Sequence, residues 1–423
     1  MINPFELAGI VFGRTAGPQA LARRTAIRLQ RLVAHAAARV PYYRELFKKA
    51  GIAPQDICGP EDLHKIPLTS REDVQSRPIE QFLAEGTDPA SLIDFATSGA
   101  TGKPLTIRQS AWDAAINQAL LLRTLVGYGM KPWHSKMSIT GKDKLPADDS
   151  WHGRIGIYRR LYLSARWSPD RWVTELQQRK PDYLFGYCMT LRLIARSLKE
   201  RAITTVRPRV IVTTSGVLDS NTRKEIADAF QCPVHDLYAS WEGGILAWEC
   251  DACGGYHVNS DWAVLEVLND GRPAKPGEEG EVVITNLHSM GMPFVRYRQG
   301  DMVVREERQP SCGCHLPLVR SICGRRPDMI VLPSGRLASP HAFMVMLDHV
   351  KGIQQWRLTQ REKAHFRLDV MASPEFGADS EVTVRNGLFN LVGRPVAVDI
   401  VRVESLPATD SGKFRYVISE VSV

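Results

Sequence analysis

Apolar positions recur at helical spacing along the first fifty residues of the chain. Between residues 18 and 40 the pattern is formed by Leu21, Ile27, Leu29, Leu32, Val33, Ala37 and Val40, and a proline then interrupts it. This spacing predicts an amphipathic helix that packs one face against a core, and a second short helix is expected at 45–50. Residues 51–80 form a proline-punctuated connector, in which Thr69 and Glu72 have the spacing of a helix-capping box.

Apolar runs then alternate with helical patterns up to residue 238. Short runs rich in Val, Ile, Leu and Tyr predict strands, and longer periodic stretches predict the helices between them. The expected strands are 92–96, 136–140, 183–187, 209–214 and 234–238, and the expected helices are 111–128, 172–178, 191–201 and 220–230. This alternation is typical of an α/β domain with a largely parallel sheet.

The pattern changes after Trp262. Two apolar strands, at 264–268 and 281–285, flank a glycine-rich segment and predict a β-meander. Beyond them, short strands mix with helices: the expected strands are 329–332 and 396–403, and the expected helices are 341–350 and 381–391.

At 423 residues the chain is longer than one hydrophobic core usually supports. A Gly-Arg-Arg-Pro break at 324–327 separates the meander from the mixed C-terminal part. We therefore predict an α/β protein with two domains. The large N-terminal domain (1–325) holds parallel sheets and the β-meander, and the small C-terminal domain (326–423) is α+β.

Composition and charge describe an ordinary globular protein, with 44% hydrophobic and 24% charged residues. The formal net charge is +8, but the basic residues are scattered, which is typical of a solvated surface and argues against a nucleic-acid partner. No run approaches the roughly 18 apolar residues of a membrane span, and the N-terminus lacks the features of a signal peptide. We expect a cytoplasmic protein without a membrane partner.

The first candidate for chemistry is the segment 97–104, Thr-Ser-Gly-Ala-Thr-Gly-Lys-Pro, which follows the first predicted strand. Glycines let a backbone approach an anion closely, while hydroxyls, amides and a lysine supply donors. Its two glycines stand three residues apart, which differs from a Walker A loop. Phosphate is the natural ligand of such a loop, and a plain polar turn is the alternative.

Five segments in this order resemble the motifs of the acyl-adenylating superfamily, the acyl-CoA synthetases and peptide-synthetase adenylation domains. They are 97–104, 236–242, 294–301, 324–328 and 411–415. Within that superfamily the chain resembles the phenylacetate–CoA ligases and the capsule-biosynthesis (CapK-like) proteins, which also share the segments 40–43, 180–183 and 292–294. The resemblance runs from about residue 25 to the C-terminus, and it implies a large adenylate-forming domain and a small mobile one.

The resemblance implies a role for each matching residue. Lys413 matches the lysine that bridges the carboxylate and the α-phosphate, Lys103 a triphosphate contact, and Glu242 the ligand of Mg²⁺. The implied ATP and AMP contacts are Thr97, Ser98, Gly99, Thr101, Gly102, Ser215, Gly216, Asp236, Tyr238, Asp301 and Arg325. The implied acyl pocket draws on Tyr187, Cys188, Ala239 and Trp241.

Two positions depart from the family pattern. Trp241 precedes the glutamate where the family commonly has Thr or Ser, so it is expected to narrow the acyl pocket or cover the adenylate. Pro327 stands at the hinge between the domains, where the family usually has Asp or Lys. Because proline fixes φ, it constrains the rotation that superfamily thioester formation uses.

The cysteines give a separate prediction. Cys250 and Cys253 form one close pair and Cys312 and Cys314 another, each in a turn that contains glycine. Two such pairs supply the four thiolates of a structural Zn²⁺ site, with His257 as a substitute for one sulfur. This places a zinc-binding insert at about 250–314, and four free thiols are the alternative.

The resemblance implies ATP- and Mg²⁺-dependent activation of a carboxylic acid, preferably aromatic, to an acyl-AMP, followed by transfer to CoA. The alternatives are transfer to an amine or hydroxyl acceptor, or transfer of AMP itself. A zinc-ribbon protein that binds nucleic acid is a third hypothesis. The presence of Lys103, Glu242, Asp301 and Lys413 argues against it, because a binding module needs none of them together. By analogy with the subgroup we expect a homodimer.

Overall fold

A computed structural model describes residues 4–13, 16–97, 105–142, 145, 151–325, 329–338, 340–406 and 415–421. The chain divides into two compact units: Met1–Met130 with Leu237–Ile322, and Lys131–Asp236 with Cys323–Val423. This partition differs from the two predicted domains, whose boundary at residues 325 and 326 stays a prediction. None of the helices in the described part of the chain combines the length and apolar character that a membrane span requires.

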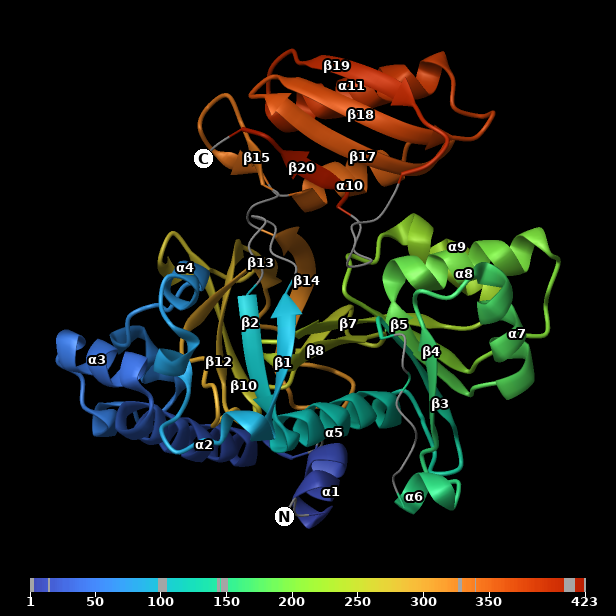
Figure 1. Ribbon diagram of the computed structural model, residues 1–423. Coiled ribbons are helices and arrows are strands. Elements are labelled where there is room, and N and C mark those ends of the chain that lie inside the picture. Colours follow the sequence, from blue (N-terminus) through green and yellow to red (C-terminus); the bar gives the residue numbers. More distant parts are fainter. Residues whose placement is uncertain are drawn as a thin grey trace. The chain divides into compact units, whose positions relative to one another are not determined.

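The first unit is built from an antiparallel sheet and helices (Figure 1). Its helices are α1 (Pro4–Phe12), α2 (Pro18–Arg39), α3 (Pro41–Ala50), α4 (Arg71–Gln75) and α5 (Ala111–Gly127). Its strands are β1 (Leu92–Thr97), β2 (Leu105–Ser110), β8 (Gly244–Cys250), β9 (Gly255–Val258), β10 (Ala263–Asn269), β11 (Arg272–Pro273), β12 (Glu279–Asn286), β13 (Tyr297–Arg305) and most of β14 (Leu318–Arg325). Strands β1 and β2 form a separate antiparallel hairpin, and the others follow the order β11-β10-β12-β13-β14-β9-β8.

Helix α2 forms because its apolar residues repeat at helical spacing. Its buried positions are Leu21, Thr25, Leu29, Leu32, Val33 and Ala36, and they form one face. Tyr43 of α3 is completely buried, and its hydroxyl accepts a 2.9 Å hydrogen bond from the amide of Val295. That bond attaches the segment before β13 to the helical layer, and so fixes the start of a strand that carries site residues.

The second unit contains a parallel sheet and a smaller mixed sheet (Figure 1). Its helices are α6 (Trp151–Arg154), α7 (Pro169–Arg179), α8 (Cys188–Glu200), α9 (Ser220–Phe230), α10 (Pro340–Asp348) and α11 (Ala378–Val392). Strands β3 (Lys136–Thr140), β4 (Arg160–Ser164), β5 (Tyr183–Tyr187), β6 (Val210–Thr214) and β7 (Val234–Ser240) lie parallel in the order β7-β6-β5-β3-β4. The boundary between the units falls within β7, whose later residues pair with β8.

The mixed sheet of the second unit belongs to the C-terminal part of the chain. Its strands are β17 (Ile353–Glu362), β18 (His365–Ala372), β19 (Ala397–Arg402) and β20 (Val417–Ser419), in the order β19-β18-β17-β20. Two short strands, β15 (Ile330–Val331) and β16 (Leu337–Ala338), pair with each other. Trp356, Phe343 and Phe366 are buried in the core of this part.

The predicted fold class is confirmed: a mixed α/β protein with a multi-strand sheet, a meander from β10 to β13 and an α+β C-terminal part. The predicted capping box is wrong by one residue. Ser70 caps α4, with its Oγ accepting from the amide of Asp73 and the Asp73 carboxylate accepting from the amide of Ser70. Thr69 is extended because its backbone pairs with the start of β13, so the helix begins one residue later.

Candidate functional site

An irregularity in β13 places two polar side chains of the predicted site. Between the paired positions Val283–Arg298 and Glu281–Met302, β12 advances by two residues while β13 advances by four. The extra residues form a bulge around Gly300, whose φ is +76°, a conformation that favours glycine. Bulges redirect side chains, and the side chains affected here are those of Gln299 and Asp301, which flank Gly300.

Asp301 is buried, and its Oδ2 accepts a 2.7 Å hydrogen bond from the hydroxyl of Tyr238. Tyr238 is also buried and lies in β7, beside an irregularity in the pairing of β7 with β8 between Tyr238 and Ala239. The two predicted nucleotide residues, 63 positions apart in sequence, therefore meet directly. The bond holds the carboxylate in one orientation.

Glu242 follows β7 and is 6% exposed. Gln299 of the bulge donates to Oε2 of Glu242 at 3.3 Å. The backbone carbonyl of Glu242 accepts from the side-chain amide of Asn286 at 2.8 Å. The sequence motifs identify neither Gln299, the partner of this carboxylate, nor Asn286, the partner of the Glu242 backbone carbonyl. Gln299 carried a signal, since it stands two positions before Asp301 in a recognised motif, whereas Asn286 carried none.

Trp241 is 45% exposed, unusually so for a large aromatic residue. Its ring stacks on that of Phe95 in β1, with centroids 4.1 Å apart and planes inclined by 20°. Its carbonyl accepts a 2.8 Å hydrogen bond from Gln109 in β2. The hairpin of β1 and β2 thus contacts the tryptophan through its ring and through its carbonyl. Ala239, in β7, is half-buried.

In the second unit, polar residues lie in the neighbouring strands β6 and β7 and directly after β6. Asp236 is buried, and its Oδ1 accepts a 2.8 Å hydrogen bond from Thr213 Oγ1. Ser215 has a φ of +62°, in the left-handed region, and so turns the chain sharply after β6. Gly216 follows, and a Cβ there would lie 3.5 Å from the Cβ of Cys188.

Two of the predicted acyl-pocket residues lie at the junction of β5 and α8. Tyr187 ends the strand and is half-buried, and Cys188 begins the helix and is 2% exposed. Burial raises the pKa of the Cys188 thiol, with the carboxylates of Asp236 and Asp219 adding to the rise. Cys188 is therefore a neutral packing residue.

Two predicted residues, Thr97 and Arg325, lie at the edges of the described ranges, and the others named below lie outside them. Thr97 is the last residue of β1, where it pairs with Leu105, and Arg325 is the half-buried last residue of β14. The predicted residues outside the described ranges are Ser98, Gly99, Thr101, Gly102, Lys103, Pro327 and Lys413.

Cysteine and histidine side chains cluster near the turn between β8 and β9. One ligand atom each from Cys250, Cys253, His257 and Cys312 lies within 4.8 Å of the others. The amides of Cys253 and Gly254 donate to the carbonyl of Cys250, at 3.3 and 3.0 Å, which forms the tight turn that brings the first two thiols together.

His257 takes the position that sequence analysis gave first to Cys314. Its Nε2 lies 3.2 Å from Cys312 Sγ, and its Nδ1 lies 3.1 Å from the carbonyl of Leu316. The carbonyl requires a proton on Nδ1, which leaves Nε2 as the ligand atom. Cys314 is buried in a cluster with Leu21, Trp248 and Leu316. Three thiols and one oriented imidazole fit a structural zinc ion.

Comparison with known proteins finds similarity in sequence and in fold. No protein-family model matches the chain. A phenylacetate–coenzyme A ligase of Thermus thermophilus is 25% identical over 386 residues, covering 88% of this chain and 84% of that protein. Protein CapK of Staphylococcus aureus is 24% identical over 299 residues, covering 68% and 64%.

Solved structures of CoA ligases share this fold. The structure of 2-hydroxyisobutyryl-CoA ligase in the postadenylation state, in complex with an acyl-AMP, superposes with a TM-score of 0.80 at 20% identity, covering 96% of this chain and 91% of that one. The same ligase has been solved with the adenylate and CoA in the thioesterification state, with a TM-score of 0.65. The resemblance inferred from the motifs is confirmed: the chain has the fold of adenylate-forming acyl-CoA ligases, and its curated relatives are phenylacetate–CoA ligases and CapK.

Proposed function

We propose that the protein is an AMP-forming acid–thiol ligase, which activates a carboxylic acid as its acyl-AMP with ATP and then transfers the acyl group to CoA. The observation that carries the proposal is the buried hydrogen bond from Tyr238 of β7 to Asp301 on the β13 bulge. Gln299 of the same bulge donates a hydrogen bond to Glu242. Phenylacetate–CoA ligases among the relatives, and a CoA ligase of the same fold with its acyl-AMP, support the reaction.

Asp301 is proposed to bind the ribose of ATP. A carboxylate has about four acceptor sites, so it accepts the Tyr238 hydrogen bond together with those of two ribose hydroxyls. Burial strengthens such bonds because water does not compete for them. Tyr238 then has two tasks: it orients the carboxylate, and its ring forms a wall for the adenine or the acyl group. Asp236, Ser215 and Gly216 are proposed contacts for the edge of the adenine.

Glu242 is proposed to hold Mg²⁺, which prefers one or two carboxylates combined with phosphate oxygens. The ion would neutralise charge on the triphosphate during attack by the substrate carboxylate. Gln299 donates to one oxygen of Glu242 and thereby orients the carboxylate. Arg325 is proposed as a partner of the ribose and phosphate.

The motifs imply the remaining contacts of the triphosphate and of the attacking carboxylate. Ser98, Thr101 and Lys103, with the backbone of Gly99 and Gly102, are proposed to hold the triphosphate. Lys413 is proposed to bridge the attacking carboxylate and the α-phosphate, where a positive charge stabilises the charge that develops in the transition state.

We propose an aromatic acid as the substrate. Trp241 and Phe95 form a stacked pair beside Glu242, and flat apolar surfaces of this kind favour another ring. Tyr187, Cys188 and Ala239 are the further acyl contacts that the motifs imply, and the neutral thiol of Cys188 would offer a small apolar surface.

A structural Zn²⁺ is proposed for the cluster of Cys250, Cys253, His257 and Cys312. A closed set of four ligands leaves no position for a substrate, so the ion would stabilise the fold and not take part in the reaction. It would join the β8–β9 turn to the segment that leads into β14.

The acceptor has a second candidate, which Pro327 favours. If this proline restricts the hinge, the enzyme would pass the acyl group to an amine or hydroxyl, or transfer AMP itself. A cytoplasmic location and a homodimer remain predictions.

The test is pyrophosphate release with a panel of aryl and alkyl acids, each with and without CoA. The proposal expects release with an aromatic acid and a thioester product only when CoA is present. Release without a thioester would assign another acceptor. An Asp301→Ala variant that releases pyrophosphate at the normal rate would remove this carboxylate from the site.

A further inference from the structure

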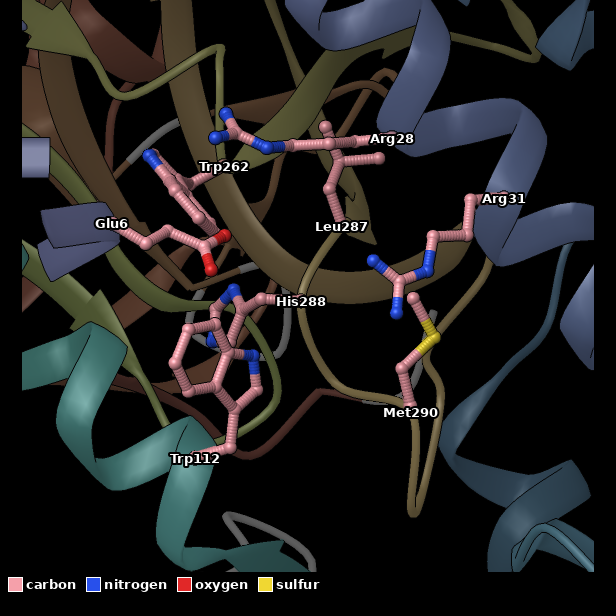
Figure 2. Close-up of a pocket in the computed structure, with 8 residues that line it drawn as sticks. All are labelled: Glu6, Arg28, Arg31, Trp112, Trp262, Leu287, His288 and Met290. Atoms are coloured by element: carbon pink, nitrogen blue, oxygen red, sulfur yellow. The ribbon is translucent and has the colours of Figure 1, made fainter. Parts of the chain in front are cut away.

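A second candidate site lies in the first unit and contains none of the predicted adenylation residues. It is a cavity of about 330 Å³, near the lower end of the roughly 300–1,000 Å³ typical of small-molecule sites. Its lining comes from α1, α2, α5 and the segments beside β10 and β12 (Figure 2). The lining residues are Glu6, Arg28, Arg31, Trp112, Trp262, Leu287, His288 and Met290.

His288 is the observation that points to a ligand. Its side chain is 3% exposed, and neither ring nitrogen has a hydrogen-bond partner among the described residues. Burial lowers the pKa of this imidazole and outweighs the opposing effects of the Asp113 carboxylate and of the Trp262 backbone, which approaches the ring without reaching hydrogen-bond geometry. The ring is thus a neutral donor and acceptor pair in a lined cavity. The indole nitrogen of Trp262, which also lines the cavity, is likewise buried without such a partner.

Charge in the cavity is arranged unevenly. The guanidinium carbon of Arg28 lies 3.6 Å from the centroid of the Trp262 ring, and Nη1 of Arg28 donates to the carbonyl of Asp261. The Arg28 guanidinium is therefore already engaged within the protein. Arg31, three residues further and hence on the same face of α2, is exposed and has no hydrogen bond or ion pair with a described residue. Glu6 adds one carboxylate, which leaves the lining with one excess positive charge.

The lining defines the chemistry of an occupant. Trp112, Trp262, Leu287 and Met290 supply apolar surface suited to a flat ring. Arg31 offers the planar pair of donors that matches a carboxylate. The Glu6 carboxylate and the acceptor nitrogen of His288 require a donor on the ligand.

We propose that this cavity binds a small aromatic carboxylic acid that carries a hydroxyl or amino group, at a site separate from the proposed ligase reaction. The acid's carboxylate pairs with Arg31, its ring lies against the tryptophans, and its hydroxyl or amino group donates to Glu6 or His288. The buried polar atoms of His288 and Trp262 then acquire partners.

Isothermal titration calorimetry of the full chain with 4-hydroxybenzoate, without ATP, tests the proposal. The dissociation constant should rise at least tenfold in Arg31→Ala, and it should stay within twofold in Arg23→Ala, which removes an exposed arginine of the same helix that does not line the cavity. Benzoate, which lacks the donor, and phenol, which lacks the carboxylate, should both bind more weakly. His288→Leu should weaken binding too, and the exposed Arg31 position keeps the test valid if that variant misfolds.

The proposed acyl pocket is the competing source of binding heat. Trp241→Ala alters that pocket, and the binding of 4-hydroxybenzoate that depends on Arg31 should remain in this variant. Loss of binding in Trp241→Ala but not in Arg31→Ala would assign the heat to the acyl pocket and overturn the proposal. Absence of saturable binding, or equal binding of phenol, would also overturn it.

Discussion

The hydroxyl of Tyr416 donates a 2.7 Å hydrogen bond to Oδ2 of Asp219, although the two residues are 197 positions apart in the sequence. Asp219 caps helix α9 through the amide of Thr222, whose hydroxyl also reaches the same carboxylate at 2.6 Å. Arg192 lies 3.4 Å from the tyrosine oxygen. Tyr416 follows Lys413 by three residues, so this buried network fixes the chain directly after the proposed catalytic lysine.

Tyr416→Phe should therefore lower both stability and activity. It removes a hydrogen bond to a buried carboxylate, and such bonds contribute about 1.5–3 kcal/mol. Pyrophosphate release should fall through kcat more than through KM for the acid, because Lys413 acts on the developing charge. Tyr158→Phe is the matched control, since its hydroxyl has no hydrogen bond with a described residue. Equal thermal unfolding of Tyr416→Phe and the parent would contradict the prediction.

The stability of the folded protein should depend on pH through Asp348. Burial, assisted by the charge of Asp219, raises the pKa of this carboxyl to about 6. A folded-state pKa above the unfolded one means that the folded protein binds more protons, so stability is lost as pH rises between about 4 and 6. Asp348→Asn should leave stability nearly unchanged at pH 4 and raise it by about 1–2 kcal/mol at pH 7, a figure reduced because the side chain is only half-buried.

Thermal unfolding across that pH range checks the Asp348 prediction. Asp228→Asn, an exposed change on α9, serves as the control and should give parallel curves. A stabilisation by Asp348→Asn that is the same at pH 4 and pH 7 would show that charge is not the cause.

The cysteine cluster predicts which substitutions release zinc. The purified protein should hold close to one equivalent of zinc, and Cys250→Ser, Cys312→Ser and His257→Ala should each lose it. Because Cys314 packs in a separate apolar cluster, Cys314→Ser should retain the metal. Chelation should lower Tm by about 5–10 °C, as expected for the loss of a few kcal/mol in a unit of this size. Metal analysis in which Cys314→Ser is the variant that loses zinc would restore the four-cysteine site.

The bond between Tyr238 and Asp301 predicts coupled effects on ATP use. Asp301→Asn should reduce kcat/KM for ATP roughly a hundredfold, since the amide accepts fewer hydrogen bonds. Tyr238→Phe should raise KM for ATP roughly tenfold, in line with one lost charge-assisted bond. The double variant should be less impaired than the sum of both, because the tyrosine acts through the carboxylate. Strict additivity in pyrophosphate-release kinetics would show that Tyr238 does not orient Asp301.

The sequence predicted periodic elements well and side-chain partners poorly. Helix α9 begins and ends at the predicted residues, because its apolar spacing and its capping aspartate agree. Asp301 was found from its motif, but its tyrosine partner was assigned only to the nucleotide pocket. The pairing of Gln299 with Glu242 depends on the bulge in β13, and a bulge follows from strand register, which no local pattern encodes.

The same limit explains two other differences. The cysteine spacing identified both close pairs, but only the strand pairing of His257 with Leu318 reveals why the histidine faces Cys312. Ser70 rather than Thr69 caps α4, since Thr69 is occupied by backbone pairing with a strand more than two hundred residues away. Long-range pairing overrides local signals in each case.

The bulge in β13 also constrains how this chain tolerates insertions and deletions. Its surplus over β12 is an even number of residues, so inward and outward positions stay in phase on both sides: Tyr297, Asp301 and Val303 are all buried. Removing one residue would turn Val303 toward solvent and reverse every later side chain of the strand. Between the start of β13 and Asp301, this strand should therefore tolerate a change in the number of residues less well than a side-chain substitution.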